Sequence, residues 1–184
     1  MTSLQGTLLI ASPQLPDPNF YRTVVLVLEH HEEGALGLVL NRPGNGTVRQ
    51  TLESACGPSP QNDQALFVGG PVPGPLMVLH THPQFSEQEV MPGIYFASRK
   101  EYVLGIVAHP GGQFRMFNGY SGWGQDQLEG ELRGGGWLTL SARHDYIFGA
   151  VDDTLWTCAV REIGRDILSH VLKHTTGPSD PSCN

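Results

Sequence analysis

Residues 22–46 read RTVVLVLEHHEEGALGLVLNRPGNG, and this segment indicates the centre of the expected sheet. Its first part, residues 22–30, is rich in valine and apolar on both side-chain parities, which is typical of a strand covered on both faces. A charged turn reaching Gly34 leads into a second apolar run, residues 35–40. A short connection that contains glycine favours an antiparallel pairing of the two runs. We therefore expect a central β-hairpin.

The rest of the chain alternates short apolar runs with turns rich in glycine and proline. These runs predict further strands and helices around the hairpin. The last helix is the clearest, because apolar residues recur at helical intervals and two aspartates precede it as N-caps. The expected strands are residues 6–11, 66–68, 76–80, 93–97, 114–120 and 137–140; the expected helices are 48–55 (N-cap Thr47), 98–108, 125–132 and 152–173, the last with Asp152, Asp153, Trp156, Val160, Ile163, Ile167 and Val171.

Strands that come both as neighbours and as strand–helix–strand units predict an α+β fold with a mixed, mostly antiparallel sheet. No internal repeat or interdomain linker interrupts the pattern. We expect one compact domain over residues 1–174, with packed helices and a C-terminal amphipathic helix. Residues 175–184 have little to bury and are expected to be a flexible tail.

Composition narrows the classes of function. The net charge is −7, and of the eleven Lys and Arg residues only Arg99 and Lys100 are adjacent. Without a basic stripe, direct nucleic-acid binding is disfavoured. Three widely spaced cysteines without a CxxC motif indicate neither a disulfide framework nor a zinc site, and suit a reducing cytosol. No apolar stretch approaches the ~20 residues of a membrane span. We expect a cytoplasmic protein.

The first candidate site residues lie where the hairpin ends, at Asn41-Arg42-Pro43. Pro43 disfavours helical geometry at Arg42, and Asn41 can hydrogen-bond nearby backbone to shape the corner. Arg42 then presents a fork of donors. That fork either holds a carboxylate or phosphate ligand, or clamps an internal carboxylate such as Glu29, Asp17 or one on a helix. The internal clamp is the favoured interpretation.

Two histidine pairs offer other chemistry. His80 and His82 share one face of a strand, which suits a metal, but the local spacing supplies no third ligand, so no metal site is predicted. Pro83 ends the strand, which would leave His82 at an exposed end. Glu29 and His30 are a better candidate for an acid–base pair. Their structural alternative is a carboxylate–imidazole pair at a strand end.

Glycine-rich segments supply the remaining candidates. Gly69-Gly70 is either a nest of backbone N–H groups for an anion or, as we favour, a turn between strands. Gly119-Tyr120-Ser121-Gly122 lacks the spacing of a nucleophile elbow, so Ser121 is not expected to be catalytic. Instead we expect Gly122 and Gly124 to form a tight strand-to-helix turn, with Trp123 packed as an anchor.

Several motifs in this order resemble the AlgH/YqgE family of bacterial proteins. They are GTLLIASPQLPDPNFYRTVVLVLEH (residues 6–30), GALGLVLNRP (34–43), FVGGPV (67–72), VLH (78–80), GYSGWGQDQLEGEL (119–132) and DDTLWTCAVREIG (152–164). The resemblance spans residues 4–167. The resemblance implies a compact α+β domain with a curved mixed sheet. It implies no enzymatic activity, because none is established for the family. One branch of the family is described as a transcriptional regulator of alginate production. Ser121 stands where the family usually has alanine, which removes it from any shared reaction.

The sequence therefore favours a non-enzymatic binding or regulatory module without cofactor or metal. Its partner would be an unknown anionic small molecule or a protein. The site would form where the candidate residues converge. The alternative is a hydrolase or other small-molecule enzyme that uses Glu29 and His30. Direct DNA binding follows from the family label alone, and the acidic charge opposes it. The predicted ligand-binding residues are Asn41, Arg42, Gly69, Gly70, Tyr120 and Trp123.

Overall fold

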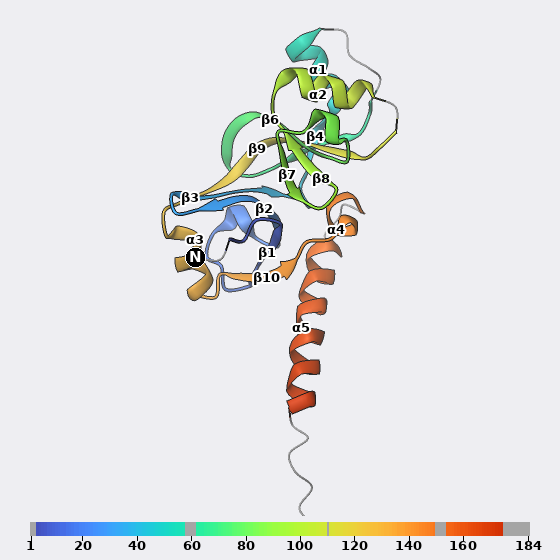
Figure 1. Cartoon of the computed structure of the whole chain (residues 1–184). Coiled ribbons are helices and arrows are strands. Elements are labelled where there is room, and N and C mark those ends of the chain that lie inside the picture. The colour runs from blue at the N-terminus through green and yellow to red at the C-terminus, as the bar shows by residue number, and fades with distance from the viewer. Residues whose placement is uncertain (1–2, 58–61, 110, 150–153, 175–184) are drawn as a thin grey trace, which may run out of the picture.

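The computed structural model describes residues 3–57, 62–109, 111–149 and 154–174. The expected tail at residues 175–184 and the aspartates expected to cap the last helix lie outside these ranges. Within them the chain forms one curved sheet with five α-helices, which confirms the expected α+β fold (Figure 1). The strands are β1 (Thr7–Ala11), β2 (Val24–His31), β3 (Gly34–Val39), β4 (Pro43–Thr47), β5 (Ala65–Val68), β6 (Val72–His80), β7 (Gln88–Met91), β8 (Ile94–Ala97), β9 (Phe114–Gly124) and β10 (Trp137–Ser141).

The sheet follows the order β10-β1-β2-β3-β9-β6-β8-β7, and β4 and β5 branch from it beside β9. Neighbours pair antiparallel except β5 and β9, which are parallel. The sheet is thus mixed and mostly antiparallel, as predicted. The expected hairpin is β2–β3, and its register places Val25 opposite Val39. It lies in the interior of the sheet, between β1 and β9.

Alternation along β2 explains why its sequence is apolar on both parities. Val24, Leu26 and Leu28 belong to one buried cluster, while Val25 and Val27 belong to another on the opposite face. All five are fully buried. Because both faces are covered, no polar position interrupts the run.

Helices cover the three buried clusters of the core. The first core cluster, which contains Val24, lies beneath α4 (His144–Phe148) and α5 (Thr154–His174). The second core cluster, which contains Val25, lies beneath α3 (Gln127–Arg133). The third joins α1 (Val48–Cys56) and α2 (Lys100–Ala108) to β6 and β9. In Figure 1, α1 and α2 lie together at one end of the molecule and α5 extends from the other. The capping box at Thr47 confirms the predicted start of α1.

Four local features differ from the prediction. The sequence pattern misses the strands β4 and β7 and the short helix α4. It also ends β9 too early. Residues 121–124 continue the strand and pair with residues 34–37 of β3. The strand-to-helix turn expected at Gly122 and Gly124 is therefore wrong. The chain turns instead at Asp126, whose positive φ of 59° precedes α3.

The predicted C-terminal helix is confirmed, but only its first half packs against the sheet. Leu155 and Ala159 are buried in the first core cluster. Farther along, Ile167 and Leu168 are 58% and 62% exposed, and the helix extends away from the body (Figure 1). None of the helices in the described ranges is long and apolar enough to cross a membrane.

Candidate functional site

The predicted ligand-binding residues do not converge on one cleft. The backbone of Arg42 pairs with Val68, next to Gly69, but its guanidinium turns toward the loop before β2. There it donates to the carbonyl oxygens of Asn19 and Tyr21, the second at 3.3 Å. Burial lowers the pKa of Arg42, and the nearby Asp17 carboxylate opposes that shift. The clamp that the sequence favoured is thus made to backbone carbonyls instead of a carboxylate.

Asn41 joins the two ends of the hairpin. Its side-chain oxygen accepts a hydrogen bond from the amide of Val24 at 3.0 Å, and its amide group donates to the carbonyl of Arg22 at 2.8 Å. Arg22 has a positive φ of 51°, which is unusual for a residue with a side chain. The Asn41 bridge holds that strained backbone in place. Asn41 is 7% exposed, so its role in this structure is to join the hairpin.

Gly69 and Gly70 lie against backbone, without an open nest. The amide of Gly69 donates to Asn118, and its carbonyl accepts from Val39 and from the hydroxyl of Ser121 at 3.1 Å. A Cβ on Gly70 would lie 2.2 Å from the carbonyl carbon of Tyr120. Glycine is required here because two backbones approach closely. Ser121 is fully buried, which agrees with its expected lack of catalytic function.

Tyr120 and Trp123 project to opposite faces of β9, as their odd separation requires. Tyr120 packs against the first core cluster, and Trp123 belongs to the second. The indole of Trp123 is 5% exposed and donates to the carboxylate of Glu131 at 3.0 Å. Trp137 donates to the same oxygen at 2.7 Å. Of the two roles expected for Trp123, packing anchor and ligand-binding residue, the structure has the packing anchor.

Glu29 and His30 are not paired with each other. His30 Nδ1 accepts from the amide of Leu4 at 3.0 Å, so Nε2 carries the proton that binds Glu129 at 2.7 Å. Glu29 lies 3.4 Å from His31 on the other face of the strand and lines a shallow depression of about 210 Å³ that His30 does not line. The pairing required by the enzymatic alternative is absent, because neighbouring residues of a strand point in opposite directions.

His80 and His82 are both buried, so the expected exposed end at His82 is wrong. His80 Nδ1 accepts from the amide of His82 at 3.2 Å, and the Nε2 atoms of both rings lack partners in the described part of the chain. Burial lowers the pKa of His80 to about 4, with a smaller contribution from His82. Across the described ranges no three metal-ligating side chains gather into a site.

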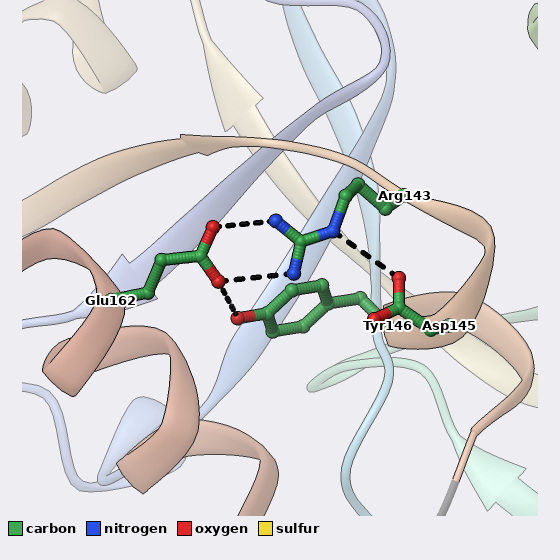
Figure 2. Close-up of polar contacts among 4 residues, drawn as sticks. All are labelled: Arg143, Asp145, Tyr146 and Glu162. Atoms are coloured by element: carbon green, nitrogen blue, oxygen red, sulfur yellow. Dashed lines mark hydrogen bonds and ion pairs between the residues drawn. The ribbon is translucent and has the colours of Figure 1, made fainter. Parts of the chain in front are cut away.

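One polar cluster unforeseen from the sequence ties α4 to α5 (Figure 2). Arg143 holds the Glu162 carboxylate with two nitrogens, one at 3.0 Å, and the Tyr146 hydroxyl donates to it at 2.6 Å. These donors lower the pKa of Glu162 to about 2. A cavity of about 670 Å³ lies beside them, and Arg161 and Arg165 also line it. The groups drawn in Figure 2 bind one another, which makes this cluster a structural joint.

A second cavity, of about 440 Å³, is lined by a charged side chain that has no carboxylate partner in the described residues. Arg115 on β9 lines it and is 6% exposed. Its guanidinium donates to the carbonyls of Leu40 at 3.2 Å and Gly149 at 2.9 Å, and lies 4.6 Å from the ring centre of Phe67. Burial lowers its pKa to about 10. No carboxylate in residues 3–57, 62–109, 111–149 or 154–174 forms an ion pair with it. We call this space the Arg115 cavity.

The sequence contains one signal for Arg115. It stands two residues before Phe117 in β9, on the parity that faces the first core cluster, and pairs with the buried Leu79. A charged residue at a core-facing position of a strand indicates either a paired charge or a binding site. The remaining walls come from β4, β5 and α4, which only the tertiary structure brings together.

Residues 8–168 match the model of the AlgH-like family. The chain belongs to the AlgH-like family. A UPF0301 protein of Myxococcus xanthus is 38% identical over 173 residues, covering 90% of this chain and 94% of the relative. One from Chlorobium chlorochromatii is 39% identical over 166 residues, covering 86% of each chain. This agrees with the resemblance of the motifs.

Solved structures support the AlgH-like fold. The solution structure of the AlgH protein from Pseudomonas aeruginosa matches with a TM-score of 0.77 and 29% identity over 97% of both chains. The crystal structure of protein DIP2367 from Corynebacterium diphtheriae matches with a TM-score of 0.67 and 23% identity, covering 88% of this chain and 87% of the other, and shows the fold alone.

Proposed function

We propose that this AlgH-like protein is a non-enzymatic binding module that takes a small anionic ligand in the Arg115 cavity. One observation carries the proposal. A guanidinium that is almost entirely buried lines a cavity, and in the described residues two carbonyl oxygens and the ring of Phe67 hold it without a carboxylate. Carbonyl dipoles offset only part of the cost of burying a charge. A carboxylate or phosphate would supply the missing negative charge and a two-pronged acceptor.

The candidates for catalysis are already engaged in structural bonds. The Ser121 hydroxyl donates to a carbonyl in a fully buried position, and His30 is held on both sides, by Leu4 and Glu129. A nucleophile or base must instead reach a substrate. These contacts favour binding over hydrolysis. The proposal also places the protein in the bacterial cytoplasm, where an exposed thiol such as that of Cys158 remains reduced.

The test is thermal unfolding with a panel of small carboxylates and phosphates. A ligand that binds only the folded state stabilises it by RT ln(1 + [L]/Kd), about 2.7 kcal/mol at one hundred times Kd. We expect at least one anion to raise the melting temperature of the native protein, and Arg115→Gln to lose that increase. Arg133→Gln is the matched control, since Arg133 is exposed on α3 and does not line the cavity.

Removing the buried guanidinium also leaves the carbonyls of Leu40 and Gly149 without a donor, so Arg115→Gln will be less stable in itself. Arg115→Lys therefore accompanies it, because lysine keeps the charge but not the fork. We expect the lysine variant to bind the same anion more weakly, by about tenfold or more. Equal stabilisation of the native protein and both variants by every anion would overturn the proposal.

A further inference from the structure

We propose that the ligand of the Arg115 cavity is an aromatic carboxylate. This inference rests on the proposed function and adds the chemical class of the ligand. Three phenylalanines from three different elements line the cavity: Phe67 on β5, Phe114 on β9 and Phe148 on α4. Aromatic side chains give a flat apolar ligand more contact area than aliphatic ones and interact favourably with an aromatic ring.

The charged end of the cavity is fixed in position. The two carbonyl bonds to Leu40 and Gly149 hold the Arg115 guanidinium from two sides, and Phe67 lies 4.6 Å from it. A guanidinium has five N–H donors, so two bonds leave donors for a ligand. Phe67 and Gly149 themselves line the cavity, which places the guanidinium at its wall. A ligand carboxylate at that wall would lie beside the apolar surface of Phe67.

The mouth of the cavity is polar. Gln64 and Gln113 line it and are exposed, and neither side-chain amide has a hydrogen-bond partner among the residues that the structure describes. An amide offers both a donor and an acceptor. A ring nitrogen or a hydroxyl on the ligand would find partners there. The cavity thus runs from a buried cation, past aromatic walls, to neutral polar groups.

Charge and size favour a carboxylate over a phosphate. One guanidinium balances one negative charge, and among the described residues that line the Arg115 cavity no second side chain is cationic. A phosphate dianion would leave one charge unbalanced beside three phenylalanines, which is costly. The volume of about 440 Å³ lies within the 300–1,000 Å³ that is usual for small-molecule sites. It accommodates a one- or two-ring acid without rearrangement of the walls.

Isothermal titration of the full chain with matched probes tests the inference. Indole-3-carboxylate and benzoate are the aromatic acids; benzamide removes the charge, cyclohexanecarboxylate removes the aromaticity, and propionate and inorganic phosphate remove the ring. We expect the aromatic acids to bind at least tenfold more tightly than each of these four. The methyl resonance of Ala65, which lines the cavity, should shift with the aromatic acids and locate the binding.

Two variants test whether the ligand ring contacts Phe148. Phe148→Leu should weaken the binding of indole-3-carboxylate at least fivefold and leave the affinity for propionate unchanged. Phe85 is partly buried against the third core cluster and does not line the cavity, so Phe85→Leu should alter neither affinity. If cyclohexanecarboxylate, propionate or phosphate matched the aromatic acids, the inference would be overturned while the proposed function stood. If no acid and no phosphate bound, or if binding left the Ala65 methyl unshifted, the proposed function would fail as well.

Discussion

At the scale of single residues, Gly70 shows how a motif that suggests ligand binding can instead serve packing. A Cβ at this position would overlap the backbone of Tyr120 and Ser121, which cannot move aside as a side chain can. We expect Gly70→Ala to destabilise the protein by roughly 3 kcal/mol, the upper end of overpacking costs. Gly130→Ala in α3 meets no atom within 4 Å and should stabilise by about 0.5–1 kcal/mol. Urea unfolding of both variants checks the contrast; equal effects would show that the backbones do not approach closely.

His80 carries a prediction about acid. Its pKa falls from 6.5 to about 4 in the folded protein because the ring is buried and His82 is close. The unfolded chain therefore binds the proton more readily between these two values. Protonation of His80 in the unfolded chain therefore costs the folded protein nothing above pH 6.5. As the pH falls from 6.5 toward 4, it lowers the free energy of unfolding by an amount on the order of 3 kcal/mol.

Replacement of His80 by leucine isolates that contribution. Other groups also titrate in acid, so the quantity to measure is the difference between native protein and variant in urea unfolding from pH 7.5 to 4.5. The native protein should lose more stability than His80→Leu over this interval. His31→Leu, at a ring that is 61% exposed, should follow the native protein. Parallel curves for all three proteins would contradict the assignment.

At the scale of elements, the long helix α5 depends on one joint for part of its attachment. Glu162 accepts hydrogen bonds from Arg143 and Tyr146, and these bonds lower its pKa to about 2 (Figure 2). The contribution of the ionised Glu162 carboxylate to the free energy of unfolding is thus complete above pH 4.5 and disappears as the pH falls toward 2. Since Arg143 is about half exposed, solvent screening reduces the strength of the ion pair.

Glu162→Gln should loosen α5 without unfolding the sheet. We expect the opening free energy of amides in the packed half of α5 to fall by about 1 kcal/mol, which accelerates hydrogen exchange roughly fivefold. The amides of β2 should retain their native rates, because that strand is buried on both faces. Glu53→Gln on the exposed surface of α1 serves as the control. Equal acceleration in α5 and β2 would mean that the joint supports the whole fold.

At the scale of the whole molecule, the net charge of −7 opposes direct binding of DNA. We expect no change in the fluorescence anisotropy of a labelled duplex, even at salt as low as about 50 mM, where phosphate contacts are strongest. Binding that strengthens steeply as salt is reduced would contradict this expectation. It would also favour a direct regulatory action on DNA over a role that begins with a small ligand.

Much of the fold followed from local patterns. The apolar run of β2, the capping box of α1 and the helical periodicity of α5 each depend on neighbours within a few residues, which sequence displays directly. The misses have long-range causes. β9 continues through Gly124 only because β3 supplies its hydrogen bonds, and the pattern beyond Tyr120 looks like a turn. Strand ends depend on partners distant in sequence, which local patterns do not contain.

The candidate site divides in the same way. The family motifs and the acidic charge can be read from the sequence alone, whereas for Asn41 and Trp123 it left both a structural role and ligand binding open. Which arginine is buried beside a cavity depends on the tertiary structure. Arg42 comes just after one apolar strand and Arg115 near the start of another, yet Arg42 turns to the carbonyls of a surface loop and Arg115 to the Arg115 cavity. Phe67, Arg115 and Phe148 meet there because the sheet and α4 fold over one core, and that proximity is a product of packing across the whole chain.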